Sequence, residues 1–225
     1  MATDFVEPRT DGFHSLRVAA VDHLCDDAVA VTFDVPDDLR GAYAFRPGQF
    51  LTLRQHTDNG EERRSYSICA PLGAAPRVGV RRVTSGLFSE WLVDRLEAGD
   101  EVDVGPPSGS FTPDLEPGTH HGLIAAGSGI TPVLSIAASL LAAHNNTRVT
   151  LLYGNRRTDT VMFTEELADL KNTYTGGCTW FTCCPGSRRP RSPPDASTWT
   201  SSANCSRCSW TPRAWTAGGC AGRWA

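Results

Sequence analysis

The chain has 225 residues, enough for one large domain or two modest ones. Its formal net charge of −4 excludes the strongly basic field that binding to nucleic acid or to an anionic membrane requires. The polar start from Met1 to Thr10 lacks the apolar core of a signal peptide, and no stretch approaches the roughly 20 apolar residues of a membrane-spanning helix. We therefore expect a cytoplasmic protein with no membrane and no nucleic-acid partner.

Short alternating segments separated by turn residues predict a small antiparallel β barrel over residues 12–114. The expected strands are residues 15–22, 28–35, 50–55, 64–70, 77–82 and 101–104. Pro47-Gly48 predicts a turn before the third strand. Residues 87–96 predict a helix whose Leu87 and Trp91, with Leu92 and Leu96, face the core.

Arg64-Ser65-Tyr66-Ser67-Ile68, in the fourth expected strand, combines groups that suit a flavin. Alternate strand residues share a face, so Arg64, Tyr66 and Ile68 point the same way. The Arg64 fork suits phosphate oxygens and the Tyr66 ring suits stacking on an isoalloxazine, while Ser67 can donate to flavin N5. The alternative is an ordinary strand with an exposed arginine and a tyrosine in the core.

A phosphate cradle for the same cofactor is expected where the next helix begins. A helix N-terminus presents free N–H groups to a pyrophosphate, Gly86 lets the backbone approach closely, and Ser89 can add a hydroxyl. Arg82 can pair with phosphate, although a basic strand in water has the same sequence. The FAD-binding residues expected here are Val80, Arg82, Val83, Gly86, Leu87, Phe88 and Ser89.

A third segment, Gly105-Pro106-Pro107-Ser108-Gly109-Ser110-Phe111, is a stiff turn that closes the barrel. The patterns Arg-x-Tyr-Ser, Gly-x-x-Ser and Pro-x-Gly-x-Phe thus occur in order and at ordinary spacing. In these segments the sequence resembles the ferredoxin–NADP reductase superfamily. The resemblance implies an antiparallel FAD-binding barrel followed by an α/β nicotinamide-dinucleotide domain with a parallel sheet.

The start of that second domain is expected over residues 120–176. The apolar run 123–126 predicts a strand buried on both faces, and His120 and His121 before it are expected to be solvent-facing linker residues. A glycine-rich turn and a helix to about Ala143 follow, which together form a phosphate cradle. We expect the nicotinamide dinucleotide to contact Gly127, Ser128, Gly129, Ile130, Thr131 and Pro132, with Thr131 also touching FAD.

Residues 149–154 predict the next strand, with Asn155, Arg156 and Arg157 at its carboxyl end. Arginines at this point of a βαβ unit can hold a ribose 2′-phosphate, so we expect NADPH rather than NADH to bind. The alternative is a solvated basic loop. Residues 164–172 predict a helix with Thr164 as its N-cap.

A closer resemblance rests on the run from Tyr153 to Phe163 and on residues 63–69 and 127–135. Over roughly residues 13–176, these are similar to the reductase components of bacterial phenylacetyl-CoA epoxidases. That family continues with a Cys-Gly-Pro strand end and, in most members, a C-terminal domain with a 2Fe–2S cluster. The present sequence has neither, so no ligands for the cluster are expected here.

The composition changes abruptly after Gly176. Residues 177–225 contain no Leu, Ile, Val, Met, Lys or Tyr, but hold five of the six Trp and six of the eight Cys. Without branched aliphatic side chains, a segment has little apolar surface to offset the entropy lost on ordering. We therefore expect residues 177–225 to be an aberrant, disordered low-complexity tail.

A one-base frameshift at about Gly176 is our hypothesis for this change. In the shifted frame, residues 177–184 can encode Arg-Leu-His-Leu-Val-His-Val-Leu, which alternates like a strand. The same shift permits a helix-like segment and, near the end, Leu-Cys-Gly-Pro. Sequencing the gene tests the hypothesis.

The cysteines of the tail also raise the question of a metal site. Cys205 and Cys208 have zinc-knuckle spacing, and Cys178 and Cys183 begin a plant-type ferredoxin spacing. However, position 186, where the next cluster ligand would stand, is Gly. We predict no metal site.

The resemblance implies a flavin-dependent NAD(P)H oxidoreductase of phenylacetate catabolism. It would pass electrons from NADPH through FAD to an iron–sulfur centre and an oxygenase that acts on an aromatic acyl-CoA. Arg64 would hold the pyrophosphate and Tyr66 the ring, with Ser67 as the catalytic contact to N5. Because of the change after Gly176, we expect FAD binding with weak or absent hydride transfer. Two alternatives stay open: a reductase for another oxygenase, a ferredoxin or free flavin, and a flavin-binding protein without turnover.

Overall fold

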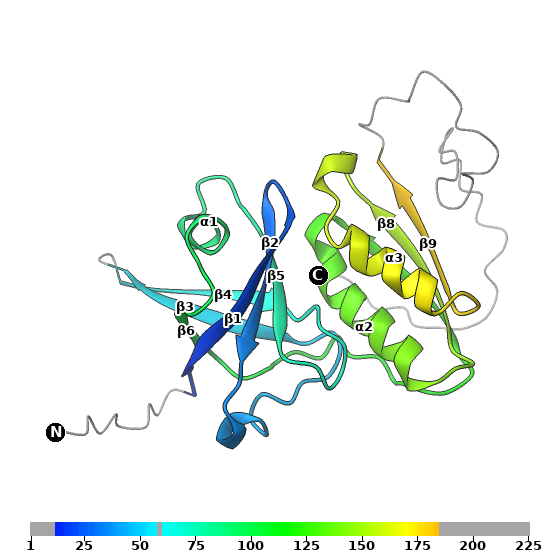
Figure 1. Ribbon diagram of the computed structural model, residues 1–225, viewed down its shortest axis with the longest axis horizontal. Coiled ribbons are helices and arrows are strands. Elements are labelled where there is room, and N and C mark those ends of the chain that lie inside the picture. The colour runs from blue at the N-terminus through cyan, green and yellow to red at the C-terminus, as the bar shows by residue number, and fades with distance from the viewer. Residues whose placement is uncertain (1–11, 58–59, 185–225) are drawn as a thin grey trace.

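The computed structural model describes residues 12–57 and 60–184 of the chain. The first half forms an antiparallel sheet, and the second half forms a smaller parallel sheet with helices beside it (Figure 1). This order confirms the predicted fold class. Among the described residues, no helix is both long enough and apolar enough to cross a membrane.

Six antiparallel strands build the first body, in the spatial order β4-β3-β6-β1-β2-β5. They are β1 (His14–Cys25), β2 (Ala28–Asp34), β3 (Phe50–Thr57), β4 (Gly60–Ser67), β5 (Arg77–Arg81) and β6 (Glu101–Val104), with a short 3-10 turn, η1 (Asp37–Leu39), after β2. A single antiparallel bridge between Ile68 and Val78 joins the two outer strands. The sheet therefore closes on itself, as the alternating sequence pattern predicts.

The barrel core is apolar, and a short helix covers one end of it. Its fully buried members include Leu16, Val29, Val31, Phe33, Leu51, Leu53, Ile68, Val78 and Val80. The helix α1 (Leu87–Asp94) turns Phe88 and Leu92 into this core. Leu87 is 67% exposed, so the prediction that it faces the core is wrong. Successive helical residues differ by about 100°, so placing Phe88 inward turns Leu87 towards solvent.

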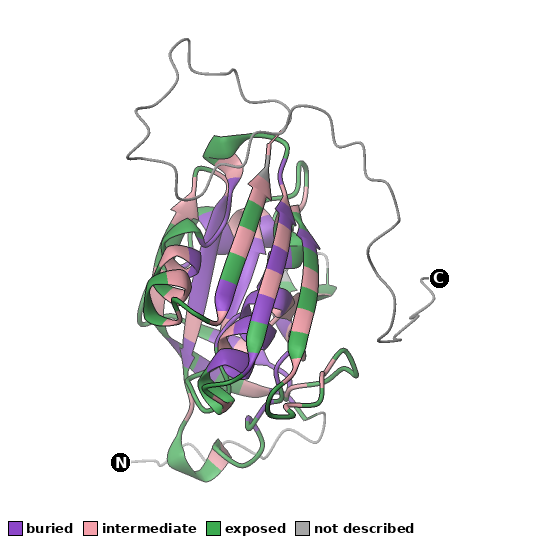
Figure 2. Cartoon of the chain, turned by 90° about the vertical axis from the view of Figure 1, so that its right-hand side faces the viewer, coloured by how far each residue is buried: buried purple, intermediate pink, exposed green. Residues whose placement is uncertain are grey.

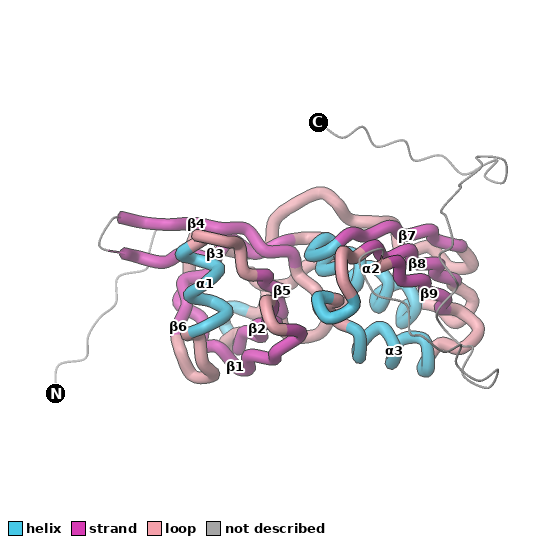
Figure 3. The backbone as a smooth tube through the Cα atoms, turned by 90° about the horizontal axis from the view of Figure 1, so that it is seen from above, coloured by secondary structure: helices cyan, strands magenta, loops and turns pink. Residues whose placement is uncertain are grey.

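The second body is a three-stranded parallel sheet in the order β7-β8-β9. Its elements are β7 (His120–Ala126), η2 (Gly127–Gly129), α2 (Ile130–Ala143), β8 (Arg148–Gly154), η3 (Thr158–Thr160), α3 (Thr164–Thr173) and β9 (Cys178–Cys183). Both helices lie against the same face of the sheet (Figure 3). The apolar residues of α2 are buried against it, as predicted.

The opposite face of this sheet is open among the described residues. Ile124, Leu152 and Phe181 stand in register across β7, β8 and β9, and Ile124 is 77% exposed. Figure 2 shows the half-buried and exposed stretches along these strands. The prediction of a strand buried on both faces is therefore wrong, because α2 and α3 cover one face only.

Two local predictions in this body need correction. His120 and His121 are not linker residues: they pair with β8 as the first residues of β7. Backbone pairing in a parallel ladder needs no apolar side chain, which is why the apolar run marked only the end of the strand. Thr164 is not the N-cap of α3, because Phe163 occupies that position at φ 60° and no side chain caps the helix.

The expectation of a disordered tail from residue 177 is also wrong for its first residues. β9 pairs along its length with β8, from Val149 opposite Cys178 to Gly154 opposite Cys183. Thr179, Trp180, Phe181 and Thr182 have side chains that favour strands, and Cys178 is buried. A strand thus forms here in the sequence as it stands. Residues 185–225, with the other tail cysteines, lie outside the described residues.

The two bodies contact each other along β5 and the segment that follows β4. In the barrel, Gly79 of β5 lies against Thr131 and Phe163 of the second body. The Ser135 hydroxyl donates to the carbonyl oxygen of Ala70 at 2.6 Å. Two atoms of the Arg77 guanidinium pair with Glu166 of α3 at 3.1 Å and with Asp22 of β1 at 2.9 Å. The interface is therefore closely packed and also held by specific polar contacts.

Candidate functional site

The end of β4 places an aromatic ring and a hydroxyl beside the barrel rim. Tyr66 is half-buried and stacks on Phe88 of α1, with ring centroids 6.3 Å apart and an interplanar angle of 27°. Burial raises the pKa of the Tyr66 phenol to about 12, so the ring is neutral at ordinary pH. Ser67 is half-buried as well, and within residues 12–57 and 60–184 no hydrogen bond uses its hydroxyl.

The Ile68–Val78 bridge marks the point where β4 and β5 separate. By antiparallel register, Tyr66 then lies across from Val80, and Arg64 across from Arg82, with no ladder between the strands. The Arg64 side chain is exposed and makes surface contacts with the Arg63 carbonyl oxygen at 2.7 Å and with Glu62 at 3.5 Å. Arg82 forms a close ion pair with Asp94 of α1. Both arginines therefore lie beyond the bridge, where the ladder between the two strands is open.

The N-terminus of α1 lies beside this opening in the ladder, since Phe88 of α1 stacks on Tyr66 of β4. Ser85 has a positive φ of 62°, and Gly86 precedes the helix. The Ser89 hydroxyl does not point to solvent: it accepts from the Val83 N–H at 3.0 Å and donates to the Gly86 carbonyl oxygen at 2.9 Å. Ser89 thus shapes the turn, while the first N–H groups of α1 have no partner in the preceding turn of helix.

The expected FAD residues differ in what they can offer. The side chains of Val80 and Phe88 are buried in the core, so these two can contact a ligand only through their backbone or through a ring edge. Val83 and Leu87 are 62% and 67% exposed beside the same helix N-terminus. Ser65 is exposed, and its hydroxyl lies 3.2 Å from that of Thr52.

The glycine-rich turn of the second body faces this rim. Gly127 has a φ of +51°, a conformation that residues with a side chain rarely adopt. Thr131 is buried in the first turn of α2, and its hydroxyl donates to the Ser128 carbonyl oxygen at 3.0 Å. Ser128 and Gly129 are exposed, while Ile130 is fully buried, so the turn itself is presented to solvent and its helix is anchored.

The three residues that follow β8 do not act alike. Asn155 is 7% exposed, and its Nδ2 atom has no hydrogen-bond partner among the described residues. Arg157 pairs with Asp159 through its Nε atom at 2.9 Å. Arg156 is exposed and, in the described part of the chain, makes no ion pair or hydrogen bond. Of the three, Arg156 therefore has the guanidinium group best placed to bind an anion.

Three residues at this place were not predicted from the sequence. Arg81 of β5 reaches across the interface and donates to the Thr160 carbonyl oxygen, and its Nη1 atom is 3.8 Å from where a Cβ on Gly127 would lie. Tyr153 of β8 is buried and donates to the Gly127 carbonyl oxygen at 3.1 Å. Gly79 has no space for a side chain. The role of each residue arises from a contact between the two bodies or between neighbouring strands. A motif of consecutive residues cannot predict such a contact.

These groups fit a flavin dinucleotide and a nicotinamide dinucleotide in adjacent positions. On the barrel side there are a neutral aromatic ring, an unused hydroxyl, exposed apolar groups and a helix N-terminus, as described above. On the other side, a glycine turn with a left-handed backbone opens a second helix. Free N–H groups at the start of α1 and in the glycine turn before α2 suit phosphates, and the two groups of residues lie on either side of the contact between Gly79 and Thr131.

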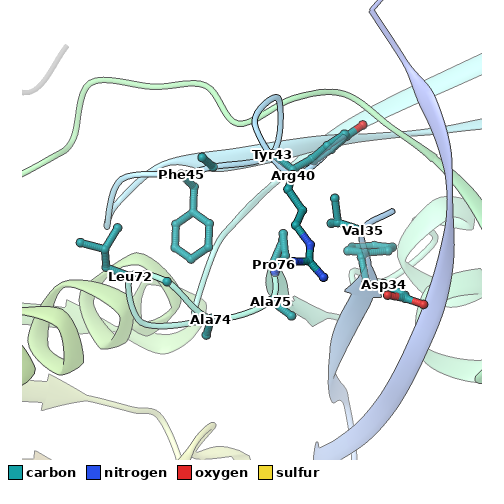
Figure 4. A pocket seen from close by; sticks show the side chains of 12 residues that line it. Asp34, Val35, Arg40, Tyr43, Phe45, Leu72, Ala74, Ala75 and Pro76 are labelled. Atoms are coloured by element: carbon teal, nitrogen blue, oxygen red, sulfur yellow. The ribbon is translucent and has the colours of Figure 1, made fainter. Parts of the chain in front are cut away.

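Two cavities lie away from these groups. One, of about 480 Å³, is formed by the loops around η1 and by residues 72–76, with Asp34 and Arg40 as its charged groups (Figure 4). Another, of about 530 Å³, lies between the barrel and the two helices of the second body, next to Arg77 and Glu166. Neither contains an expected cofactor residue. No group of three or more His, Cys, Asp or Glu side chains that could hold a metal occurs in the described ranges.

Two family models match the chain, one for each body. The model described as "Oxidoreductase FAD-binding domain" matches residues 15–112, and "Oxidoreductase NAD-binding domain" matches residues 123–202. The first match contains α1 and all six barrel strands except His14 of β1. The second contains α2, α3, β8, β9 and β7 from Leu123 on.

Curated relatives include a subunit of an epoxidase and the reductase component of a monooxygenase. One component protein of 1,2-phenylacetyl-CoA epoxidase from Escherichia coli (strain K12) is 44% identical over 165 residues, which are 72% of this chain and 46% of that protein. The ferredoxin reductase component of 3-ketosteroid-9-alpha-monooxygenase from Rhodococcus rhodochrous is 43% identical over 164 residues, 71% of this chain and 46% of that protein. The chain thus spans about half the length of these relatives.

Among solved structures, phthalate dioxygenase reductase is similar with a TM-score of 0.64 and 26% identity. The match covers 83% of this chain and 56% of that one. That structure is described as modular, for electron transfer from pyridine nucleotides to a 2Fe–2S centre.

Proposed function

Because this chain carries the FAD-binding and NAD-binding domains of the ferredoxin–NADP reductase-like oxidoreductases, we propose that it works as a reductase component of an oxygenase system. It takes electrons from a nicotinamide and passes them through FAD towards an iron–sulfur acceptor. The named functions of the relatives from Escherichia coli and Rhodococcus rhodochrous support this proposal.

One observation carries the proposal: the flavin motif and the nicotinamide motif meet at the contact between the two bodies. β5 separates from β4 beside Tyr66, and the same β5 lies against Thr131 through Gly79. Two ring systems held at these places would have adjoining edges. Electron transfer between two cofactors needs such proximity, and holding them there is what the protein supplies.

The residues of the barrel divide the binding of FAD between them. Arg64 is exposed and can turn its guanidinium towards a pyrophosphate at the opening, which the first N–H groups of α1 also face. Tyr66 packs its ring against the isoalloxazine. Ser67 offers its unused hydroxyl to N5 and is the catalytic residue of the proposal. When bound, FAD accepts two electrons from a nicotinamide and can release them one at a time.

NADPH is the proposed donor. The turn from Gly127 to Gly129 holds the pyrophosphate, and the exposed Arg156 holds the 2′-phosphate. Asn155 is buried beside it, and its Nδ2 atom, which has no partner among the described residues, can donate to the dinucleotide. Arg157 contributes less to binding the 2′-phosphate, because its guanidinium group already pairs with Asp159.

The proposal also names the protein that receives the electrons. By analogy with the epoxidase component from Escherichia coli, the electrons serve an oxygenase that acts on an aromatic acyl-CoA. Reconstitution with a 2Fe–2S ferredoxin and an oxygenase component tests this. Electrons delivered only to free flavin would instead indicate a flavin reductase.

The direct experiment is to purify the 225-residue chain and record its visible spectrum. The proposal expects the yellow spectrum of bound FAD and only slow bleaching when NADPH is added without oxygen, because the change after Gly176 should weaken hydride transfer. Fast, complete bleaching at micromolar NADPH would contradict that impairment. A protein that binds no flavin contradicts the proposal. A flavin spectrum that NADPH leaves unchanged would support a binding protein without turnover.

A further inference from the structure

The Gly127 carbonyl oxygen accepts two hydrogen bonds that do not depend on any ligand. One comes from the hydroxyl of Tyr153 at 3.1 Å, and the other from the backbone N–H of Ile130. Tyr153 lies near the end of β8, whereas Gly127 follows the end of β7. Because parallel strands end at the same edge of a sheet, a side chain from one strand reaches the turn after its neighbour.

The next carbonyl of the turn is held in the same manner. The Ser128 carbonyl oxygen accepts from the Thr131 hydroxyl at 3.0 Å and shares the single Ile130 N–H with the Gly127 carbonyl oxygen. Both carbonyl groups of the turn are therefore bound to groups on the inner side, one from β8 and one from α2.

Because the peptide bond is planar, fixing these two carbonyl groups also fixes the direction of the N–H groups that follow them. In a trans peptide, the carbonyl of one residue and the N–H of the next point in opposite directions. Fixing the carbonyl of Gly127 inward therefore directs the N–H of Ser128 outward, and fixing the carbonyl of Ser128 does the same for Gly129. Both residues are exposed, and the φ of +51° at Gly127 permits the necessary turn.

The Tyr153 hydroxyl has a second partner, the backbone N–H of Met162 at 3.3 Å. A phenol donates one proton and also accepts, so the Tyr153 hydroxyl holds both groups at once. Met162 is fully buried and precedes Phe163, which lies against Gly79 of the barrel. A single hydroxyl thus connects the glycine turn to the segment that contacts the barrel. Burial raises the pKa of the Tyr153 phenol, which keeps its proton in place.

We propose that Tyr153 is a positioning residue for the nicotinamide dinucleotide. Its hydroxyl holds Gly127 so that the N–H groups of Ser128 and Gly129 are aimed at the pyrophosphate before it binds. The inference rests on the proposed function for the identity of the ligand, but the positioning itself is a property of the free protein. Tyr153 does not touch the ligand in this proposal.

Tyr153→Phe removes only the hydroxyl and keeps the buried ring. Amide hydrogen exchange of the free protein should become faster at Ser128 and Gly129, because their peptide planes are no longer fixed. The Kd for NADPH should rise about fivefold, the effect of one hydrogen bond of about 1 kcal/mol. The rate of flavin reduction at saturating NADPH should stay within about twofold, since the bound complex restores the geometry.

Tyr43→Phe is the matched control. Tyr43 is also buried, and its hydroxyl also donates to a backbone carbonyl oxygen, that of Val104 inside the barrel. Its loss should lower thermal stability to a similar degree but leave the exchange of Ser128 and Gly129 and the Kd for NADPH unchanged. If Tyr153→Phe behaves like Tyr43→Phe in both measurements, the inference is wrong.

The two measurements also distinguish the inference from the proposed function. Should the unaltered chain bind flavin but no NADPH, the proposed function fails, and hydrogen exchange alone decides whether Tyr153 fixes the turn. Should the unaltered chain bind NADPH while both variants bind it equally well, the function stands and the positioning role of Tyr153 does not.

Discussion

Gly79 of the barrel and Thr131 of the second body touch so closely that no side chain fits between them. A Cβ atom on Gly79 would lie 2.4 Å from Thr131 Cγ2 and 2.9 Å from a ring carbon of Phe163. These distances are far below van der Waals contact. Gly79 therefore sets how near β5 comes to α2, the helix that follows the glycine-rich turn.

Replacing Gly79 by alanine should separate the two bodies. The neighbours are a buried threonine and a buried phenylalanine in a packed interface, so overpacking should cost about 1–3 kcal/mol of stability. We expect a lower melting temperature together with slower reduction of bound flavin by NADPH. Gly41→Ala serves as the control, since nothing lies within 4 Å of a Cβ at Gly41. Unchanged flavin reduction in Gly79→Ala would contradict a role of this contact in the transfer.

Removing the Ser67 hydroxyl should slow the reaction without releasing the flavin. In Ser67→Ala the ring stacking of Tyr66 and the phosphate contacts remain, so the FAD content should not change. Loss of one hydrogen bond to N5 should lower the rate of flavin reduction by about fivefold or more. Stopped-flow bleaching with NADPH measures it. Ser15→Ala, which removes a surface hydroxyl bonded to Glu101, should leave the rate as it was.

The sequence predicted those features that depend on local pattern. Alternation along the barrel strands, the turn at Pro47-Gly48 and the apolar face of α2 follow from side-chain periodicity, and the structure contains them all. The prediction for Leu87 failed because a shift of the helix start by one residue exchanges which of Leu87 and Phe88 faces the core. The rotation of the helix about its axis depends on the turn before it, which the Ser89 hydroxyl holds, and the spacing of apolar residues does not predict that turn.

β9 shows a different limit of composition-based reasoning. The lack of aliphatic residues after Gly176 predicted disorder, yet residues 178–183 pair with β8. A strand beside an existing sheet gains backbone hydrogen bonds whatever its side chains are, and Trp180 and Phe181 are good strand formers. Tyr153 and Arg81 were missed for a related reason. Their roles arise from contacts with Gly127 and Thr160, which lie 26 and 79 residues away.

Alkaline pH should weaken the folded state through its buried phenols. Burial raises the pKa of Tyr66 and of Tyr43 from 10 to about 12. A group whose pKa is raised on folding contributes stability below its unfolded pKa and loses that contribution as the pH rises through the folded value. Stability should therefore fall between about pH 10 and pH 12. Phenolate absorbance should show these two tyrosines ionising late, and Tyr66→Phe should remove part of that late change.

Arg156 should decide between the two nicotinamide donors. It is exposed and makes no ion pair among the described residues, so Arg156→Ala leaves no buried partner unsatisfied and should not change stability. A charge-assisted contact to a 2′-phosphate contributes about 1.5–3 kcal/mol, so the Kd for NADPH should rise about 10- to 100-fold. The Kd for NADH should stay the same, because NADH has no such phosphate.

Arg157→Ala provides the comparison for that experiment. The Arg157 guanidinium already pairs with Asp159, so its removal should raise the Kd for NADPH less than the removal of Arg156. Fluorescence quenching or calorimetry with NADPH, NADH and 2′-phospho-ADP measures all three affinities for each variant. Equal losses for NADPH and NADH in Arg156→Ala would show that the arginine binds the shared part of the dinucleotide. The preference for NADPH would then have to come from another residue.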